Sequence, residues 1–97
     1  MKIVDETHEI SRRRANGKLR REIWVDADGK VVRFNLAYIK RKIHRSDNGR
    51  VLGCDSQHGI WHRHHLGEVV LVEVRGFDEI EARFETEVQR YLKGERR

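Results

Sequence analysis

The chain has 97 residues, a net charge of +5, one cysteine and no proline. One cysteine excludes an internal disulfide and a cysteine-rich zinc site, and no apolar run is long enough to span a bilayer. Because no signal-peptide start is present, we expect a cytoplasmic protein. The length of the chain predicts one domain over residues 1–97.

Basic residues are concentrated in the first half of the chain. Residues 1–50 contain fourteen lysines and arginines against seven acidic residues, a net charge of +7, whereas residues 51–97 contain seven against nine, a net charge of −2. A basic half is typical of a surface that binds nucleic acid or an acidic partner. A solvated sheet face has the same composition, so charge alone leaves both interpretations open.

Alternating polar and apolar residues predict β-strands through the first three quarters of the chain. Turn sequences rich in Asn, Asp and Gly separate them. Alternation at His8, Ile10 and Arg12 favours a strand near the N-terminus. The later strands are predicted over residues 19–25, 30–45, 50–54, 62–65 and 68–74, with the basic residues 40–45 as an exposed continuation.

The segment 30–45 has the clearest alternation. Side chains two residues apart point to the same face of a strand, so the apolar ones are expected to face the core. Tyr38 is in phase with this set, which favours a core position over an exposed stacking position. The predicted core side of the strand carries Val32, Phe34, Leu36 and Tyr38.

Residues 77–93 are predicted to form an amphipathic helix, because apolar side chains recur at spacings of three and four. Asp78 and Glu81 resemble a capping box, and Gly94 is placed to end the helix. The apolar stripe consists of Ile80, Phe84, Val88, Tyr91 and Leu92. The elements together predict an α+β fold, an antiparallel β-meander of five to six strands with one C-terminal amphipathic helix packed on one face.

Residues 53–65 concentrate the chemical side chains of the protein. They hold four of the six histidines, beside an arginine, an aspartate, the only cysteine and one of the two tryptophans. Histidine exchanges a proton near neutral pH and also binds metals. In a regular strand His62 and His64 share one face, and Arg63 and His65 share the other.

One interpretation is acid/base chemistry on a polyanion. Cleavage of an RNA phosphodiester without metal needs a base, an acid and a cation beside the phosphate. We expect two imidazoles to project from one side of a β-ribbon into a cationic groove. If Arg63 points to the opposite face, Arg33 or Arg75 is the alternative phosphate clamp. The candidate catalytic residues are His62, His64, Arg63, Asp55 and His58.

A metal site is the competing interpretation. His62 and His64 are two candidate ligands of a tetrahedral site, with Asp55 or His58 completing it. The spacing is neither a helical i, i+4 pair nor a cysteine knuckle, so we expect no metal and no cofactor.

Basic runs supply candidates for phosphate neutralisation, which would make affinity fall with salt. Trp24 is a candidate for base stacking; capping a sheet edge is its alternative role. Trp61 either walls a pocket or fills the end of the sheet, and Cys54 is expected to be a small buried hydrophobe. The candidate nucleic-acid-binding residues are Arg12, Arg13, Arg14, Arg20, Arg21, Lys40, Arg41, Lys42 and Arg45.

The second half of the chain resembles the TumE-type toxin family. The similarity covers residues 50–93 and rests on Gly53-Cys54-Asp55-Ser56, then Gly59 and His62-Arg63-His64, followed by an apolar strand and a helix. Two positions differ from the family pattern, because Ser56 stands where the family prefers asparagine and Cys54 where an aromatic residue is common. If the asparagine amide is functional in the family, a serine hydroxyl would alter activity.

The resemblance implies the toxin of a two-gene toxin–antitoxin pair, held by a helix-turn-helix type antitoxin, but it implies no reaction. The basic half and the paired histidines suggest RNA as the target and a ribonuclease-like activity. A non-enzymatic module that binds nucleic acid or protein, and a divalent-metal-binding protein, are the alternatives. Membrane association is not expected, and a homo-oligomer stays open.

Overall fold

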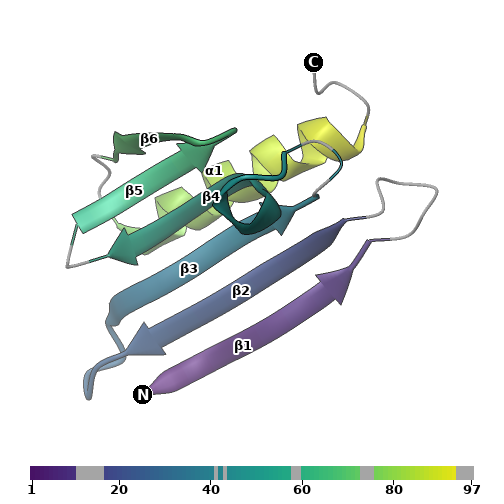
Figure 1. Ribbon diagram of the computed structural model, residues 1–97. Helices are drawn as coiled ribbons and strands as arrows, with labels where there is room; N and C mark the ends of the chain where they lie inside the picture. The colour runs from purple at the N-terminus through teal and green to yellow at the C-terminus, as the bar shows by residue number, and fades with distance from the viewer. Residues whose placement is uncertain (11–16, 41, 43, 58–59, 73–75, 94–97) are drawn as a thin grey trace.

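The computed structural model describes residues 1–10, 17–40, 42, 44–57, 60–72 and 76–93. Within them, one antiparallel sheet carries one helix on one of its faces (Figure 1). No helix of this described part is long and apolar enough to cross a membrane. The elements are β1 (Lys2–Glu9), β2 (Lys18–Val25), β3 (Val31–Ile39), a short 3-10 turn η1 (Asp47–Gly49), β4 (Arg50–Gln57), β5 (Ile60–His65), β6 (Glu68–Leu71) and α1 (Phe77–Leu92).

The strand order follows the sequence, from β1 to β6, and every neighbouring pair is antiparallel. Short connections favour this arrangement, because an antiparallel neighbour can be reached by a tight turn. The predicted meander with one C-terminal helix is confirmed. Helix α1 lies across β3 and β4 on one face of the sheet.

The core lies between α1 and the middle strands. Its largest fully buried side chains on the sheet are Tyr38, Phe34 and Leu36, together with Leu52 and Val51. The expected core role of Tyr38 is confirmed. From the helix, Ile80, Phe84 and Val88 are buried, and Tyr91 and Leu92 pack at the edge, as the predicted stripe requires.

Strand β3 departs from the predicted pattern at both ends. Val32, expected in the core, is 52% exposed, while Val31 packs against the core cluster. A register shift after Trp24 pairs Val25 with Val31, and this irregularity moves the alternation by one residue at that end. The strand ends at Ile39, so the predicted continuation over residues 40–45 is wrong where it is described.

Strand β4 is longer than predicted. Asp55 and Ser56, which follow the predicted end of the strand at residue 54, lie within it. The backbone pairing of β3 with β4 reaches Asn35 and Asp55, and the Ser56 hydroxyl then accepts the Phe34 N–H at 2.8 Å. The buried serine therefore satisfies a backbone donor at the point where the paired register ends.

The helix begins at Phe77, as predicted, but its N-terminus is capped differently. Its N-cap is Gly76, no side chain caps it, and the expected capping box of Asp78 and Glu81 is not formed. Glu81 instead pairs with Arg21 of β2. The strand predicted over residues 68–74 is seen as β6, while residues 73–75 and Gly94 lie outside the described residues.

Candidate catalytic site on the open face

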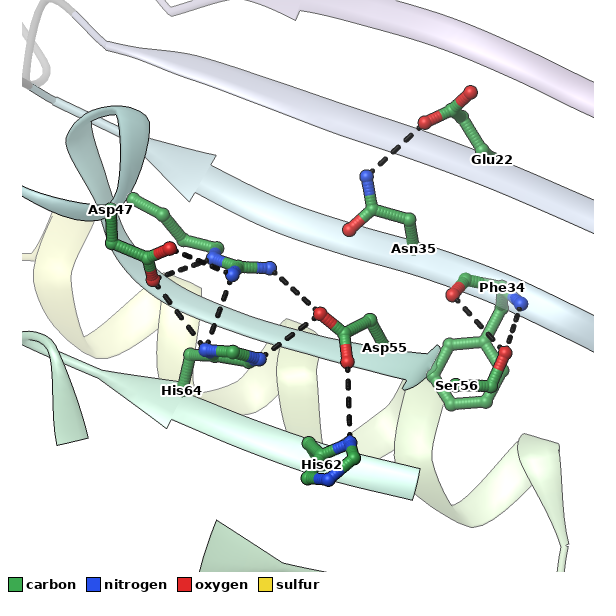
Figure 2. Close-up of polar contacts among 9 residues, drawn as sticks. Glu22, Phe34, Asn35, Asp47, Asp55, Ser56, His62 and His64 are labelled. Carbon is green, nitrogen blue, oxygen red and sulfur yellow. Dashed lines mark hydrogen bonds and ion pairs between the residues drawn. The ribbon is translucent and has the colours of Figure 1, made fainter. Parts of the chain in front are cut away.

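One face of the sheet is free of the helix and is called the open face below. It carries a row of polar side chains that lie opposite one another on four successive strands: Glu22, Asn35, Asp55 and His62. The row follows from strand alternation, because the intervening residues Phe34, Leu36 and Cys54 face α1 and form the core. Figure 2 shows this row in front of the sheet, with α1 behind it.

Asp55 lies between two histidines. Its Oδ1 is 3.6 Å from His62 Nδ1, and its Oδ2 is 3.0 Å from His64 Nε2 (Figure 2). The two imidazole centres are 6.4 Å apart. The prediction that both rings share one face is confirmed, and that face is the one opposite the helix.

Arg63 and His65 project to the other face of β5. Arg63 forms a two-point ion pair with Glu87 of α1, and His65 Nε2 lies 2.6 Å from the Tyr91 hydroxyl. The hydrogen bonds with Glu87 raise the pKa of Arg63 above its ordinary value. Arg63 thus joins the sheet to the helix, and the structure does not bring it to the two histidines of the open face.

Arg50, which the sequence interpretation did not single out, lies at the centre of the cluster. Its guanidinium donates two hydrogen bonds to Asp47, each 3.0 Å long, and one of 3.1 Å to Asp55 Oδ2. The bond from Arg50 is the main reason that the pKa of Asp47 lies below its ordinary value. Two carboxylates therefore hold this arginine in place.

The contact between Arg50 and His64 fixes the tautomer of a neutral His64. Arg50 Nη2 lies 3.1 Å from His64 Nδ1, and a guanidinium can only donate. His64 Nδ1 is then the acceptor, and the ring proton resides on Nε2, which faces Asp55. The side chain of His64 is 11% exposed, against 23% for His62, so His62 is the more accessible of the two imidazoles.

Two atoms of this cluster are buried without a well-aligned hydrogen bond: Asp55 Oδ1 and His64 Nε2. His62 Nδ1 is too far from Asp55 Oδ1 for a hydrogen bond, whereas His64 Nε2 is close enough to Asp55 Oδ2 but does not have the angles of one. A small rotation of the His62 ring would place its Nδ1–H on Asp55 Oδ1, and His62 Nε2 would then be the ring nitrogen left for a ligand.

Gly53 provides the space for this arrangement. A Cβ at this position would lie 2.5 Å from Cδ of Arg50 and 2.8 Å from the Leu36 carbonyl oxygen. The Arg50 side chain can therefore cross β4 only because residue 53 has no side chain. A glycine inside a strand was the available sign in the sequence that another group approaches the backbone there.

A hollow of about 500 Å³ borders the cluster on the open face. Its charged lining consists of three arginines and three acids: Arg20, Arg33, Arg50, Glu22, Asp47 and Asp55. The expected cationic groove is therefore wrong for this hollow, because its lining is balanced in charge. It reaches Asp55, while the rings of His62 and His64 are not part of its lining.

Trp61, the aromatic residue beside the histidines in the sequence, contacts the core. Its ring packs edge-on against Phe34, with ring centres 5.2 Å apart. It fills the end of the sheet on the helix side, and it also lines a hollow of about 610 Å³ beside Val31 and Phe77, so it has both of the roles expected for it. Cys54 is buried as expected, and burial raises the pKa of its thiol to about 11.

The predicted nucleic-acid-binding residues do not form one surface. Arg20 lies on the open face and pairs with Asp5 and Glu22, whereas Arg21 faces α1 and pairs with Glu81. Lys42 and Arg45 are exposed beyond the end of β3 with no ion-pair partner in the described part of the chain, and Lys40 is half-buried there. Outside the described residues are Arg12, Arg13, Arg14, Arg41, His58 and the alternative clamp Arg75.

Among the residues that the structure describes, no group of three or more histidine, cysteine or acidic side chains is arranged to hold a metal ion. Arg50 supplies a reason, since its positive charge occupies the position between Asp47, Asp55 and His64. His58, a candidate fourth ligand, lies outside this part of the chain.

The fold and this site define an α+β protein whose six-stranded meander is covered by α1 on one face and carries a histidine–aspartate–arginine cluster on the other. Comparison of the chain with protein-family models, curated proteins and solved structures finds no match.

Proposed function

We propose that the protein is the toxin of a toxin–antitoxin pair and that it cleaves RNA by metal-independent acid/base chemistry at His62. The observation that supports this most is the carboxylate of Asp55 between two imidazoles on the exposed side of the sheet. A carboxylate that holds one ring nitrogen of a histidine orients the other nitrogen for proton transfer.

The two histidines have unequal surroundings, and we assign them unequal roles. His62 is the more exposed, and Asp55 is its one ion-pair partner among the described residues, so we assign His62 as the general base that removes the proton of the RNA 2′-hydroxyl. His64 contacts Arg50 and Asp55 with its two ring nitrogens and orients the carboxylate. That both histidines act directly on the substrate stays a prediction. The variant His64→Ala, described below, distinguishes a direct role of His64 from a positioning role.

In the proposed reaction, the 2′-oxygen attacks the adjacent phosphorus and the bond from phosphorus to the 5′-oxygen breaks. His62 takes the proton of the nucleophile and later returns it to solvent, and the departing oxygen takes a proton from water. The product ends are a 2′,3′-cyclic phosphate and a 5′-hydroxyl. Arg33 and Arg50, both in the lining of the hollow, are the cations available to the phosphate.

The test is expression of the chain in a bacterial host together with an RNA cleavage assay on the purified protein. We expect growth arrest and cleavage for the unaltered chain and neither for the variant His62→Ala/His64→Ala. His64→Ala alone is expected to retain part of the activity if His64 positions Asp55. Arg63→Ala is the matched control, because it removes the side chain between the two histidines, which faces α1.

Arrest that persists in the double variant would remove the catalytic assignment. If charge reversal at Lys40 and Lys42 then abolishes arrest, the protein is a non-enzymatic binding module. The antitoxin part of the proposal is tested separately, by co-expression with any small helix-turn-helix protein encoded next to this chain. Relief of arrest by complex formation supports it, and the absence of such a neighbouring gene counts against it.

A further inference from the structure

One arginine of the hollow lacks the carboxylate partners that the other two have. Arg20 pairs with Asp5 and Glu22, and Arg50 pairs with Asp47 and Asp55. Arg33 forms no hydrogen bond or ion pair within the described part of the chain. Its Cζ lies 4.5 Å from the centre of the Trp24 ring, and the Lys2 ammonium lies over the same ring at 4.8 Å. The Arg33 guanidinium therefore rests on the indole and keeps its donors free.

Beside this aromatic and guanidinium surface lie two acceptor groups. Asn35 Nδ2 donates to Glu22 Oε1 at 3.1 Å, which orients the amide so that its Oδ1 has no partner among the described residues (Figure 2). Hydrogen bonds from Lys2 and Asn35 hold the pKa of Glu22 below its ordinary value, so this side chain is a carboxylate at neutral pH. All of these groups lie on the open face, and Trp24, Arg33, Asn35 and Glu22 line the same hollow.

We infer that Trp24, Arg33, Asn35 and Glu22 form a subsite for one base of single-stranded RNA. Bases stack on arginine guanidinium planes as well as on aromatic rings, and the Arg33 guanidinium, which rests on Trp24, offers such a plane. In the part of the chain that the structure describes, Asn35 Oδ1 has no partner and Glu22 Oε1 has only the Asn35 amide, so each can accept one more hydrogen bond. These neighbouring acceptors select a base whose edge presents N–H donors. Guanine presents two adjacent donors, adenine and cytosine present an exocyclic amino group, and uracil presents only one imino N–H.

The position of the subsite fits the proposed reaction, on which this inference rests. Asn35 lies opposite Asp55, and Asp55 lies opposite His62, so Asn35 is two strands from His62. Two strand spacings are roughly 10 Å. A base held at Asn35 therefore places its sugar and phosphate over Asp55, next to the imidazole that we propose as the base.

The experiment measures binding without cleavage, so that it does not depend on catalysis. The probes are four fluorescein-labelled 2′-O-methyl oligonucleotides of sequence UUNU, with N as each of the four bases, titrated with the protein at constant salt and followed by fluorescence anisotropy. We expect the guanine probe to bind at least fivefold more tightly than the all-uracil probe. Trp24→Ala is expected to weaken binding of all four probes by fivefold or more, since stacking does not depend on the base.

Two variants test the reading of the base edge. Asn35→Ala and, independently, Glu22→Gln should reduce the preference for guanine to less than twofold. Thr86→Ala, at an exposed position of α1 on the other side of the sheet, is the matched control and should keep it. Thermal unfolding curves establish that each variant is folded. If either Asn35→Ala or Glu22→Gln does not fold, the other variant alone provides the test.

The outcomes separate this inference from the proposed function. A base preference that persists in His62→Ala supports the subsite whether or not the chain cleaves RNA. Equal affinity for the four probes, or no binding to any of them, overturns the subsite, even if the unaltered chain cleaves RNA elsewhere in the site. A preference that survives both Asn35→Ala and Glu22→Gln also overturns it.

Discussion

The two faces of the sheet use the same strands for different purposes. Toward α1, β3, β4 and β5 contribute the side chains that fill the core, together with the ion pair of Arg63 and Glu87. Toward the open face, the alternate residues of these strands contribute the polar cluster around Asp55. Strand β5 shows the contrast best, because adjacent residues, Arg63 and His64, belong to the two different sets. Changes on the helix side should therefore alter stability, and changes on the open face should alter activity.

The largest expected effect on the helix side comes from Phe34. It is buried and packs against both Trp61 and Phe77. Phe34→Ala should lower the free energy of unfolding by about 3–5 kcal/mol, because it leaves a cavity in the core. Urea denaturation followed by circular dichroism measures this. A loss below about 1 kcal/mol would contradict the placement of the core under α1.

The second prediction concerns Cys54, whose pKa burial raises from 9.0 to about 11. The folded state favours the neutral thiol, so its contribution to stability is complete below pH 9 and is lost as the pH rises from 9 to 11. Two pKa units correspond to roughly 2–3 kcal/mol. Urea denaturation at pH 8 and pH 10.5 should show a steeper loss for the unaltered chain than for Cys54→Ala.

The control variant is needed because Tyr91 also has a raised pKa, mainly through burial, and it titrates at alkaline pH in both proteins. Equal losses in the two proteins would show that the thiol does not contribute. The reaction of Cys54 with an aromatic disulfide reagent at pH 8 should also be slow until urea unfolds the chain.

The third prediction concerns Ser56, whose hydroxyl is the hydrogen-bond partner of the Phe34 N–H. Ser56→Ala leaves this buried donor unsatisfied and should cost about 1–3 kcal/mol. RNA cleavage at a temperature where the variant is fully folded should be unchanged, since the hydroxyl belongs to the β3–β4 junction. A selective loss of cleavage with normal stability would instead assign Ser56 a role in the proposed reaction.

The smallest expected effect is that of Arg63→Ala. The pair of Arg63 and Glu87 is about a quarter exposed on each side chain, and such pairs contribute about 1 kcal/mol or less. Thermal unfolding should shift by a few degrees at most, and cleavage should persist. A large loss of cleavage with little loss of stability would restore Arg63 as a candidate that contacts the substrate.

The alternation of residues was sufficient to predict the fold and the shared face of His62 and His64. It failed at Val32, because a register irregularity between β2 and β3 shifts which side chains face the core. A single sequence does not show where one strand has an extra residue relative to its partner. The start of the helix at Phe77 was predicted, but the expected capping box is not formed, and Glu81 pairs with Arg21 of β2.

Asp47 and Arg50 could not be assigned to the site from their spacing. Their approach to Asp55 depends on the turn η1, where Asp47 has φ 54° and Gly49 has φ 81°, and on the missing side chain of Gly53. Left-handed backbone at a non-glycine residue is uncommon. Tertiary contacts of Arg50 with Asp47 and Asp55 hold this turn, and such contacts have no periodic signature in the sequence.

The meander order has a consequence for how the molecule opens. Strand β1 pairs only with β2 and contributes no buried side chain, so it can detach without disturbing the core. Local opening of this kind is governed by the few contacts that a segment makes. Backbone amides of β1 are therefore expected to exchange with deuterium well before those of β3 and β4, and the outer edge of the molecule would fray while Asp55 and His62 keep their positions.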